Sequence, residues 1–166
     1  MNSIVFQEMR EKRSLAYQAS SRYLMGYDKN DKNYNLAHIA TQNDKVVEAF
    51  DAFNSLLDYM PIAENNFELA KQSLLKSIAT NRTTKQGIIS SYLNDKMYGR
   101  SDNSMKKYYE ALQKITFDDI KAFSETKLKG QKRVYVILGS KEQINFDEVK
   151  KFGDIEELTL EEIFGY

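Results

Sequence analysis

A change of hydrophobic period near the start of the chain constrains its fold more than any other feature. Val5, Phe6 and Met9 recur at helical spacing and lead into a charged run at residues 10–13. From residue 17 to residue 25 the pattern changes to alternation, which is typical of a strand. The sequence therefore predicts a helix that leads almost directly into a strand.

Two hydrogen-bond donors flank this change of structure. Arg10 falls in the last turns of the predicted helix, and Tyr17 stands at the start of the predicted strand. A guanidinium and a phenol can both donate to a peptide carbonyl or to an oxyanion. We expect the two side chains to converge on one point. The alternative is structural: Arg10 pairs with Glu11 or another carboxylate, and Tyr17 packs on the sheet.

The rest of the chain alternates between clear strand and helix patterns. Residues 17–25 and 33–41 predict two strands of a hairpin, joined by a turn-rich segment. Amphipathic patterns then predict helices within 44–60, 67–78, 88–96 and 105–115, followed by a helix capped at Thr116.

Two later segments complete the predicted order of elements. The near-continuous apolar run at 133–139 predicts an interior strand that is buried on both faces. The acidic segment at 146–166 predicts a short helix and a loosely packed tail. We therefore expect one α+β domain over residues 1–166, with an antiparallel sheet covered on one face by several helices.

Charge and hydropathy exclude several classes of partner. The chain has 24 Lys and Arg residues and 24 Asp and Glu residues, so no net field attracts nucleic acid or an anionic membrane surface. No apolar run approaches the roughly 20 residues that cross a bilayer. We therefore expect no nucleic-acid partner and no membrane span.

The scarcity of histidine and cysteine argues against a metal site. A zinc site needs three or four ligands, usually from His and Cys, and this chain offers His38 and no cysteine. His38 lies in an alternating strand without a paired nucleophile, which favours a structural histidine over a catalytic one. We predict no metal and no cofactor on this chain. The lack of cysteine fits the cytoplasm and the bacterial periplasm equally, so the compartment stays open.

The stretch from Phe6 to Tyr17 resembles the zinc peptidases that include insulysin, pitrilysin and the mitochondrial processing peptidase. In that family a helix ending in a run similar to Arg10-Glu11-Lys12 is followed by a small residue, leucine, a small residue and tyrosine, as at residues 14–17. The later order of elements is also similar. The His-x-x-Glu-His zinc motif of the family's catalytic domain is absent. The resemblance thus implies a zinc-free C-terminal domain of a zinc metalloendopeptidase.

The resemblance has consequences for the site and for the partners. It implies that Arg10 and Tyr17 contact the peptide substrate or the oxyanion, while zinc and the general base belong to upstream domains of the same polypeptide or to a zinc-bearing partner subunit. This chain alone is then inactive. The family's domain usually opens with strands that are missing here, so we expect an upstream segment or a partner to complete the sheet.

Two alternatives remain open at this point. Members of the same family also serve as non-catalytic core subunits of a respiratory complex, so the chain could be a structural or interaction domain of this fold. The chain could also be an unrelated helical binding module in which the match from Arg10 to Tyr17 is a coincidence. Such a module would be stable and monomeric alone.

Overall fold

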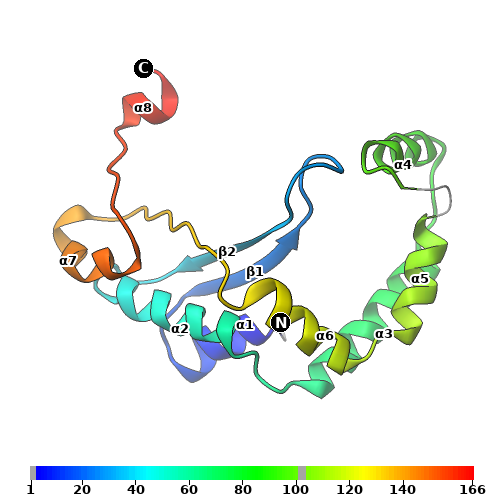
Figure 1. Cartoon of the computed structure of the whole chain (residues 1–166), viewed down its shortest axis with the longest axis horizontal. Coiled ribbons are helices and arrows are strands. Elements are labelled where there is room, and N and C mark those ends of the chain that lie inside the picture. Colours follow the sequence, from blue (N-terminus) through cyan, green and yellow to red (C-terminus); the bar gives the residue numbers. More distant parts are fainter. Residues whose placement is uncertain (1–2, 101–103) are drawn as a thin grey trace.

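A computed structural model describes residues 3–100 and 104–166 and shows an α+β architecture (Figure 1). The chain begins with the helical turn α1 (Ile4–Phe6) and a π-helical segment (Gln7–Lys12), and then enters strands β1 (Gln18–Leu24) and β2 (Tyr34–Ala40). A 3-10 turn (Asn43–Lys45) leads to α2 (Val46–Asp58), α3 (Glu64–Thr80), α4 (Lys85–Met97), α5 (Ser104–Lys114) and α6 (Phe117–Phe123). A second π-helical segment (Ser124–Leu128), two 3-10 turns (Lys141–Gln143 and Lys150–Phe152) and the short helices α7 (Phe146–Val149) and α8 (Leu160–Phe164) follow.

The predicted hairpin is confirmed. β1 and β2 pair antiparallel, with the register running from Gln18 opposite Ala40 to Leu24 opposite Tyr34. Asp31 shapes the connecting turn, because its carboxylate accepts hydrogen bonds from the backbone N–H groups of Tyr27 and Asp28 at 3.0 and 3.3 Å. Gly26 is required beside it, since a Cβ at this position would lie 2.3 Å from the Asp31 Cβ.

The main core forms where α2 crosses the hairpin. The buried residues of this cluster are Met9, Ala16, Ala19, Ala49, Ala52 and Phe53. Met9 is fully buried, and the alanines on α2 let the helix approach the sheet closely. This core joins the N-terminal helical turns, the hairpin and α2 into one unit, which fixes the position of residues 10–17.

A second side of α2 holds the extended segment 130–139. The Asp58 carboxylate accepts from the Gly130 backbone N–H at 3.1 Å and from Arg133 Nη2 at 2.5 Å. Farther along, Tyr135 Oη donates to Asn54 Oδ1 at 3.0 Å. Ile137 packs on the small cluster of Val46, Ile144 and Val149. The segment therefore runs antiparallel to α2, from its C-terminal end to its N-terminal end.

The prediction that residues 133–139 form a strand buried on both faces is wrong. The segment is extended, but within the described residues it joins no sheet. Val134, Val136 and Leu138 are 93%, 90% and 101% exposed, so one face of the segment is open. An apolar run shows that a segment can be buried, but burial on both faces needs a second covering layer. The described residues cover only the inner face, through α2 and through Ile144, Val149 and Phe152.

Helices α3, α4 and α5 form an arm beside the sheet (Figure 1). Within this arm α3 lies along α5, and Lys71 Nζ donates to the Ile115 carbonyl at 2.8 Å. The hairpin is covered by α2 and the N-terminal turns, and α6 reaches it through an edge-to-face contact between Phe123 and Tyr23. The hairpin is therefore contacted by α2, by the N-terminal helical turns and by α6.

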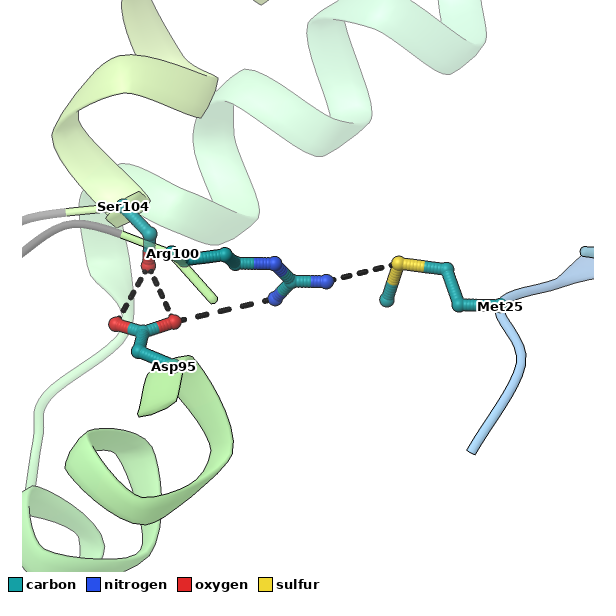
Figure 2. A network of polar contacts seen from close by, with 4 residues as sticks. All are labelled: Met25, Asp95, Arg100 and Ser104. Atoms are coloured by element: carbon teal, nitrogen blue, oxygen red, sulfur yellow. Dashed lines mark hydrogen bonds and ion pairs between the residues drawn. The ribbon is translucent and has the colours of Figure 1, made fainter. Parts of the chain in front are cut away.

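Arg100 connects the arm to the hairpin (Figure 2). Its Nη2 donates to the Met25 sulfur at 2.8 Å, and its Nη1 lies 3.9 Å from Asp95 Oδ1. Ser104 Oγ donates to the same carboxylate at 2.9 Å, which joins α4 to the start of α5. A single guanidinium therefore bridges the junction of α4 and α5 to the end of β1.

The chain exposes far more surface than a compact monomer of its size. Its solvent-accessible area is 13196 Å², whereas a folded 19.3 kDa monomer exposes roughly 8,500 Å². Long apolar side chains on the arm and on α8 contribute to the difference, and every residue from 153 to 166 is exposed. Much of the apolar surface of the chain is therefore open to solvent.

Candidate functional site

A tight reversal of the backbone links Arg10 to Tyr17. The Leu15 N–H donates to the Met9 carbonyl at 2.9 Å, and the Ser14 N–H donates to the Arg10 carbonyl at 3.1 Å. Ser14 adopts a left-handed conformation with φ of 52°, which L-residues other than Gly, Asn and Asp rarely take. This reversal ends the π-helical segment and turns the chain into β1.

Burial alternates along the reversal, so that both candidate residues face outward. Met9 and Ala16 are buried in the main core, whereas the adjacent Arg10 and Tyr17 are exposed. The Tyr17 N–H donates to the Ala40 carbonyl at 2.8 Å, which extends the pairing of the hairpin by one hydrogen bond. The core residues thus fix the backbone, and the side chains of Arg10 and Tyr17 are open to solvent.

The Arg10 guanidinium lies against two aromatic rings. Its central carbon is 4.9 Å from the centroid of Phe6 and 5.7 Å from the centroid of Tyr17, which are cation–π distances. Arg10 takes part in no ion pair among the described residues, and Tyr17 is 76% exposed. The structural alternative, a carboxylate partner for Arg10 and a packed Tyr17, is therefore not what the structure shows.

Arg10 and Tyr17 line one shallow cavity of about 490 Å³. Its other polar residues are Ser14, Thr41, Gln42 and Lys45, and no carboxylate lines it. Lys45 Nζ lies 3.5 Å from a Glu48 carboxylate oxygen on the following turn. Two cations and several neutral donors can hold a carbonyl oxygen or an anion.

Sequence reasoning missed Thr41, Gln42 and Lys45 as members of the cavity. The hairpin prediction itself contained the signal, because its register places the end of β2 beside the start of β1. Thr41 also supports the site, since its Oγ1 donates to the Leu15 carbonyl at 2.6 Å. Lys45 comes next to the site through the 3-10 turn that follows β2.

A search for metal ligands covers the part of the chain that the structure describes. His38 is exposed on β2, and the described ranges contain no group of three His, Cys, Asp or Glu side chains close enough to hold a metal ion. The full sequence has one histidine and no cysteine.

A second cavity lies between α3 and α5 and has a different character. This groove of about 580 Å³ is lined mainly by Leu74, Ile78, Tyr108, Leu112 and Ile115. It lacks the convergent polar groups that orient a substrate. The lining of this groove is mainly apolar, with Lys114 and Asp119 as its charged residues, whereas the cavity at Arg10 and Tyr17 is lined by more polar side chains.

Comparison with known proteins gives no relative from which a function could be transferred. No protein-family model matches the chain, and no curated protein matches it. Among the described helices, none combines the length and apolar character needed to cross a bilayer. The residues of the site and the exposed surface are therefore the observations that bear on function.

Proposed function

We propose that this chain is a zinc-free, C-terminal helper domain of a zinc metalloendopeptidase similar to insulysin and the processing peptidase, and that Arg10 and Tyr17 contact its peptide substrate. The observation that carries the proposal is the meeting of these two side chains at one cavity, where no carboxylate neutralises the guanidinium. The chain supplies donors, and the zinc-bearing part supplies the metal and the general base.

The chemistry of the two side chains suits the hydrolysis of a peptide bond. When water attacks the scissile carbonyl, negative charge develops on its oxygen. The Arg10 guanidinium can donate a charge-assisted hydrogen bond to that oxygen or to a neighbouring carbonyl, and the Tyr17 phenol can donate a second one. Donors placed before the reaction stabilise the transition state, and removing one typically lowers turnover by about 10² to 10³.

The size of the exposed surface supports the proposal that a partner covers part of this chain. The chain exposes roughly 4,700 Å² more than a compact monomer of its mass, which exceeds a standard interface of about 1,600 Å². Upstream domains of the same polypeptide or a zinc-bearing partner subunit would cover this surface. Such a partner would also close the shallow cavity around a bound peptide.

The test compares matched substitutions in the assembled peptidase, with zinc present and an internally quenched peptide as substrate. Arg10→Lys keeps the charge but loses the planar fork, and Tyr17→Phe keeps the ring but loses the donor. We expect kcat to fall about 10-fold to 100-fold for Arg10→Lys and about 10²-fold to 10³-fold for Tyr17→Phe, with the unfolding transition unchanged. Arg13→Lys and Tyr27→Phe, both at exposed positions, are the controls. Turnover equal to wild type in both site variants would contradict the proposal.

The second candidate function is a non-catalytic structural or interaction domain. It is favoured by apolar surface that lies far from the cavity, on α4 and α8, where Ile89, Leu93, Leu160 and Phe164 are exposed. This alternative predicts stable assembly with a partner but no peptide turnover in the wild-type assembly, even with zinc. The same assay therefore separates the two functions.

A further inference from the structure

We propose that residues 132–138 bind an extended strand of the partner polypeptide, one with alternating apolar side chains and a carboxylate at the end that lies beside Lys132. The inference rests on the proposed function only for the identity of that partner. It assigns the place of docking and the chemistry of the docked segment.

The segment is held straight by contacts on its inner face. Arg133 is fixed by Asp58, and the Tyr135 ring lies 4.5 Å from the ring of Phe50. At the far end Gly139 passes so close to the 3-10 turn before α2 that a Cβ would lie 2.6 Å from the Asn43 side-chain oxygen. Contacts at both ends and in the middle therefore set its extended form before anything binds.

The other sides of the segment are open. Within the described residues, the backbone N–H and C=O groups of residues 132–139 make no backbone–backbone hydrogen bond. The side chains of Val134, Val136 and Leu138 are almost fully exposed. An extended backbone with free donors and acceptors is a template for one more strand, and alternating apolar residues on that strand would cover the three exposed side chains.

Charge at the two ends of the segment differs. Lys132 makes no ion pair among the described residues, and nearby Lys129 lies 5.3 Å from the centroid of the Tyr59 ring and is attracted to the Asp58 carboxylate without a direct ion pair. Arg133 is neutralised by Asp58, and Lys141 beyond the other end is paired with Glu157. Spare positive charge is therefore concentrated at the start of the segment, which is where a carboxylate of the bound strand would lie.

A second copy of this chain fits residues 132–138 less well than a strand of another polypeptide. In an antiparallel pair centred on Val136, Lys132 of each copy would stand opposite Ser140 of the other copy. The carboxylate of the other copy nearest to each lysine is that of Glu142, which already accepts a hydrogen bond from its own Ser140 Oγ at 2.9 Å. A strand from another polypeptide can provide both the alternating apolar residues and the charge.

The experiment uses the full chain without zinc and acetylated peptides of alternating valine and threonine. One peptide carries glutamate at its N-terminal end, one carries it at its C-terminal end, and one has lysine in place of glutamate. A fourth peptide has alternate amides N-methylated. Binding is measured by fluorescence anisotropy, and amide hydrogen exchange of residues 132–139 locates the site. Light scattering during size exclusion reports self-association.

We expect one of the two glutamate peptides to bind and to slow amide hydrogen exchange at residues 132–138 about tenfold. The N-methylated peptide should bind at least about tenfold more weakly than that glutamate peptide. Lys132→Glu should weaken binding of that peptide about threefold and favour the lysine peptide. Val136→Lys, at an exposed position that leaves the inner face intact, should abolish binding without unfolding the chain. The control is Lys85→Glu, at the exposed start of α4.

Two results would overturn the inference: no peptide slows exchange in this segment, or the free chain is a dimer whose amides at 132–138 are already protected. The readout needs no peptidase activity. Peptide binding at residues 132–138 together with unchanged turnover in the Arg10 and Tyr17 variants would therefore contradict the proposed function and still support the docking segment.

Discussion

The central carbon of the Arg10 guanidinium lies 5.7 Å from the centroid of the Tyr17 ring, although the two residues belong to different elements. The helical turns carry Arg10, and the first pairing position of the hairpin carries Tyr17. Because the contact is a cation–π interaction at the surface, it orients the guanidinium without occupying all of its N–H donors. The arrangement suits a residue that must bind an oxygen atom from outside the chain.

The first prediction separates residues that serve a ligand from residues that hold the fold. Arg10→Ala and Tyr17→Phe remove only exposed groups and should lower the free energy of unfolding by less than about 1 kcal/mol. Met9→Ala, at the adjacent fully buried position, should lower it by about 2 to 5 kcal/mol. Urea unfolding of the three variants makes the comparison. A loss for Arg10→Ala as large as that for Met9→Ala would show that Arg10 is structural.

The second prediction concerns the left-handed residue in the reversal. Ser14 has φ of 52°, where glycine has no Cβ to clash. Ser14→Gly should raise the free energy of unfolding by up to about 1 kcal/mol, because relief of strain exceeds the added entropy of the unfolded chain. Ser14→Val, which is β-branched, should lower it by about 1 to 2 kcal/mol. Thermal unfolding gives both values, and Ser20, exposed on β1 and substituted in the same two ways, is the control.

Local patterns in the sequence predict most of the elements. Alternation identified both strands of the hairpin, and helical spacing identified α2 to α5 to within a few residues of their observed ends. The Thr116 cap is also confirmed, since its Oγ1 accepts from the Asp119 N–H at 3.2 Å while the Asp119 carboxylate accepts from the Thr116 N–H at 2.8 Å. These features depend on neighbours in the sequence.

Features that depend on distant neighbours were harder to predict. The run at 133–139 is apolar enough for an interior strand. Its burial depends on which distant residues pack on each face, and Val136 is left exposed among the described residues. No local pattern encodes this. Lys45 reaches the cavity of Arg10 through the turn after β2, so its role depends on three-dimensional placement. Only the Arg10 and Tyr17 positions were close enough in sequence to be predicted together.

The third prediction concerns the pH dependence of the anchor that holds segment 130–139. The hydrogen bond from Arg133 lowers the pKa of Asp58 below its usual value, and the bond from the Gly130 N–H adds to the effect. A lowered folded-state pKa means that the stabilisation is present above the unfolded pKa of about 3.9 and is lost as pH falls through the folded value. Asp58→Asn should therefore lower the free energy of unfolding at pH 7 by about 1 kcal/mol.

The difference in the free energy of unfolding between wild type and Asp58→Asn should shrink as pH drops below about 4. The wild-type carboxylate then becomes protonated and loses its charge, as in the variant. Urea unfolding at pH 7, 4 and 3 measures this. Asp51→Asn on the same helix, whose carboxylate forms an exposed ion pair with Lys151, is the control and should change stability by less than about 0.5 kcal/mol. If the loss of unfolding free energy in Asp58→Asn stayed constant down to pH 3, the charge of Asp58 would not be what holds segment 130–139.

The fourth prediction tests whether Arg100 fixes the arm of α3, α4 and α5 to the hairpin. Arg100→Lys retains the positive charge, but a single ammonium cannot reach the Met25 sulfur and the Asp95 carboxylate at the same time. We expect faster amide exchange in α4 by about threefold to tenfold, with little change in α2, because local opening of the arm becomes easier while the main core is untouched. Arg82→Lys, in the exposed linker before α4, is the matched control and should leave exchange unchanged. Equal exchange in α4 for the Arg100 variant and wild type would mean that packing of α3 on α5 alone sets the position of the arm, and that the contact with Met25 is incidental.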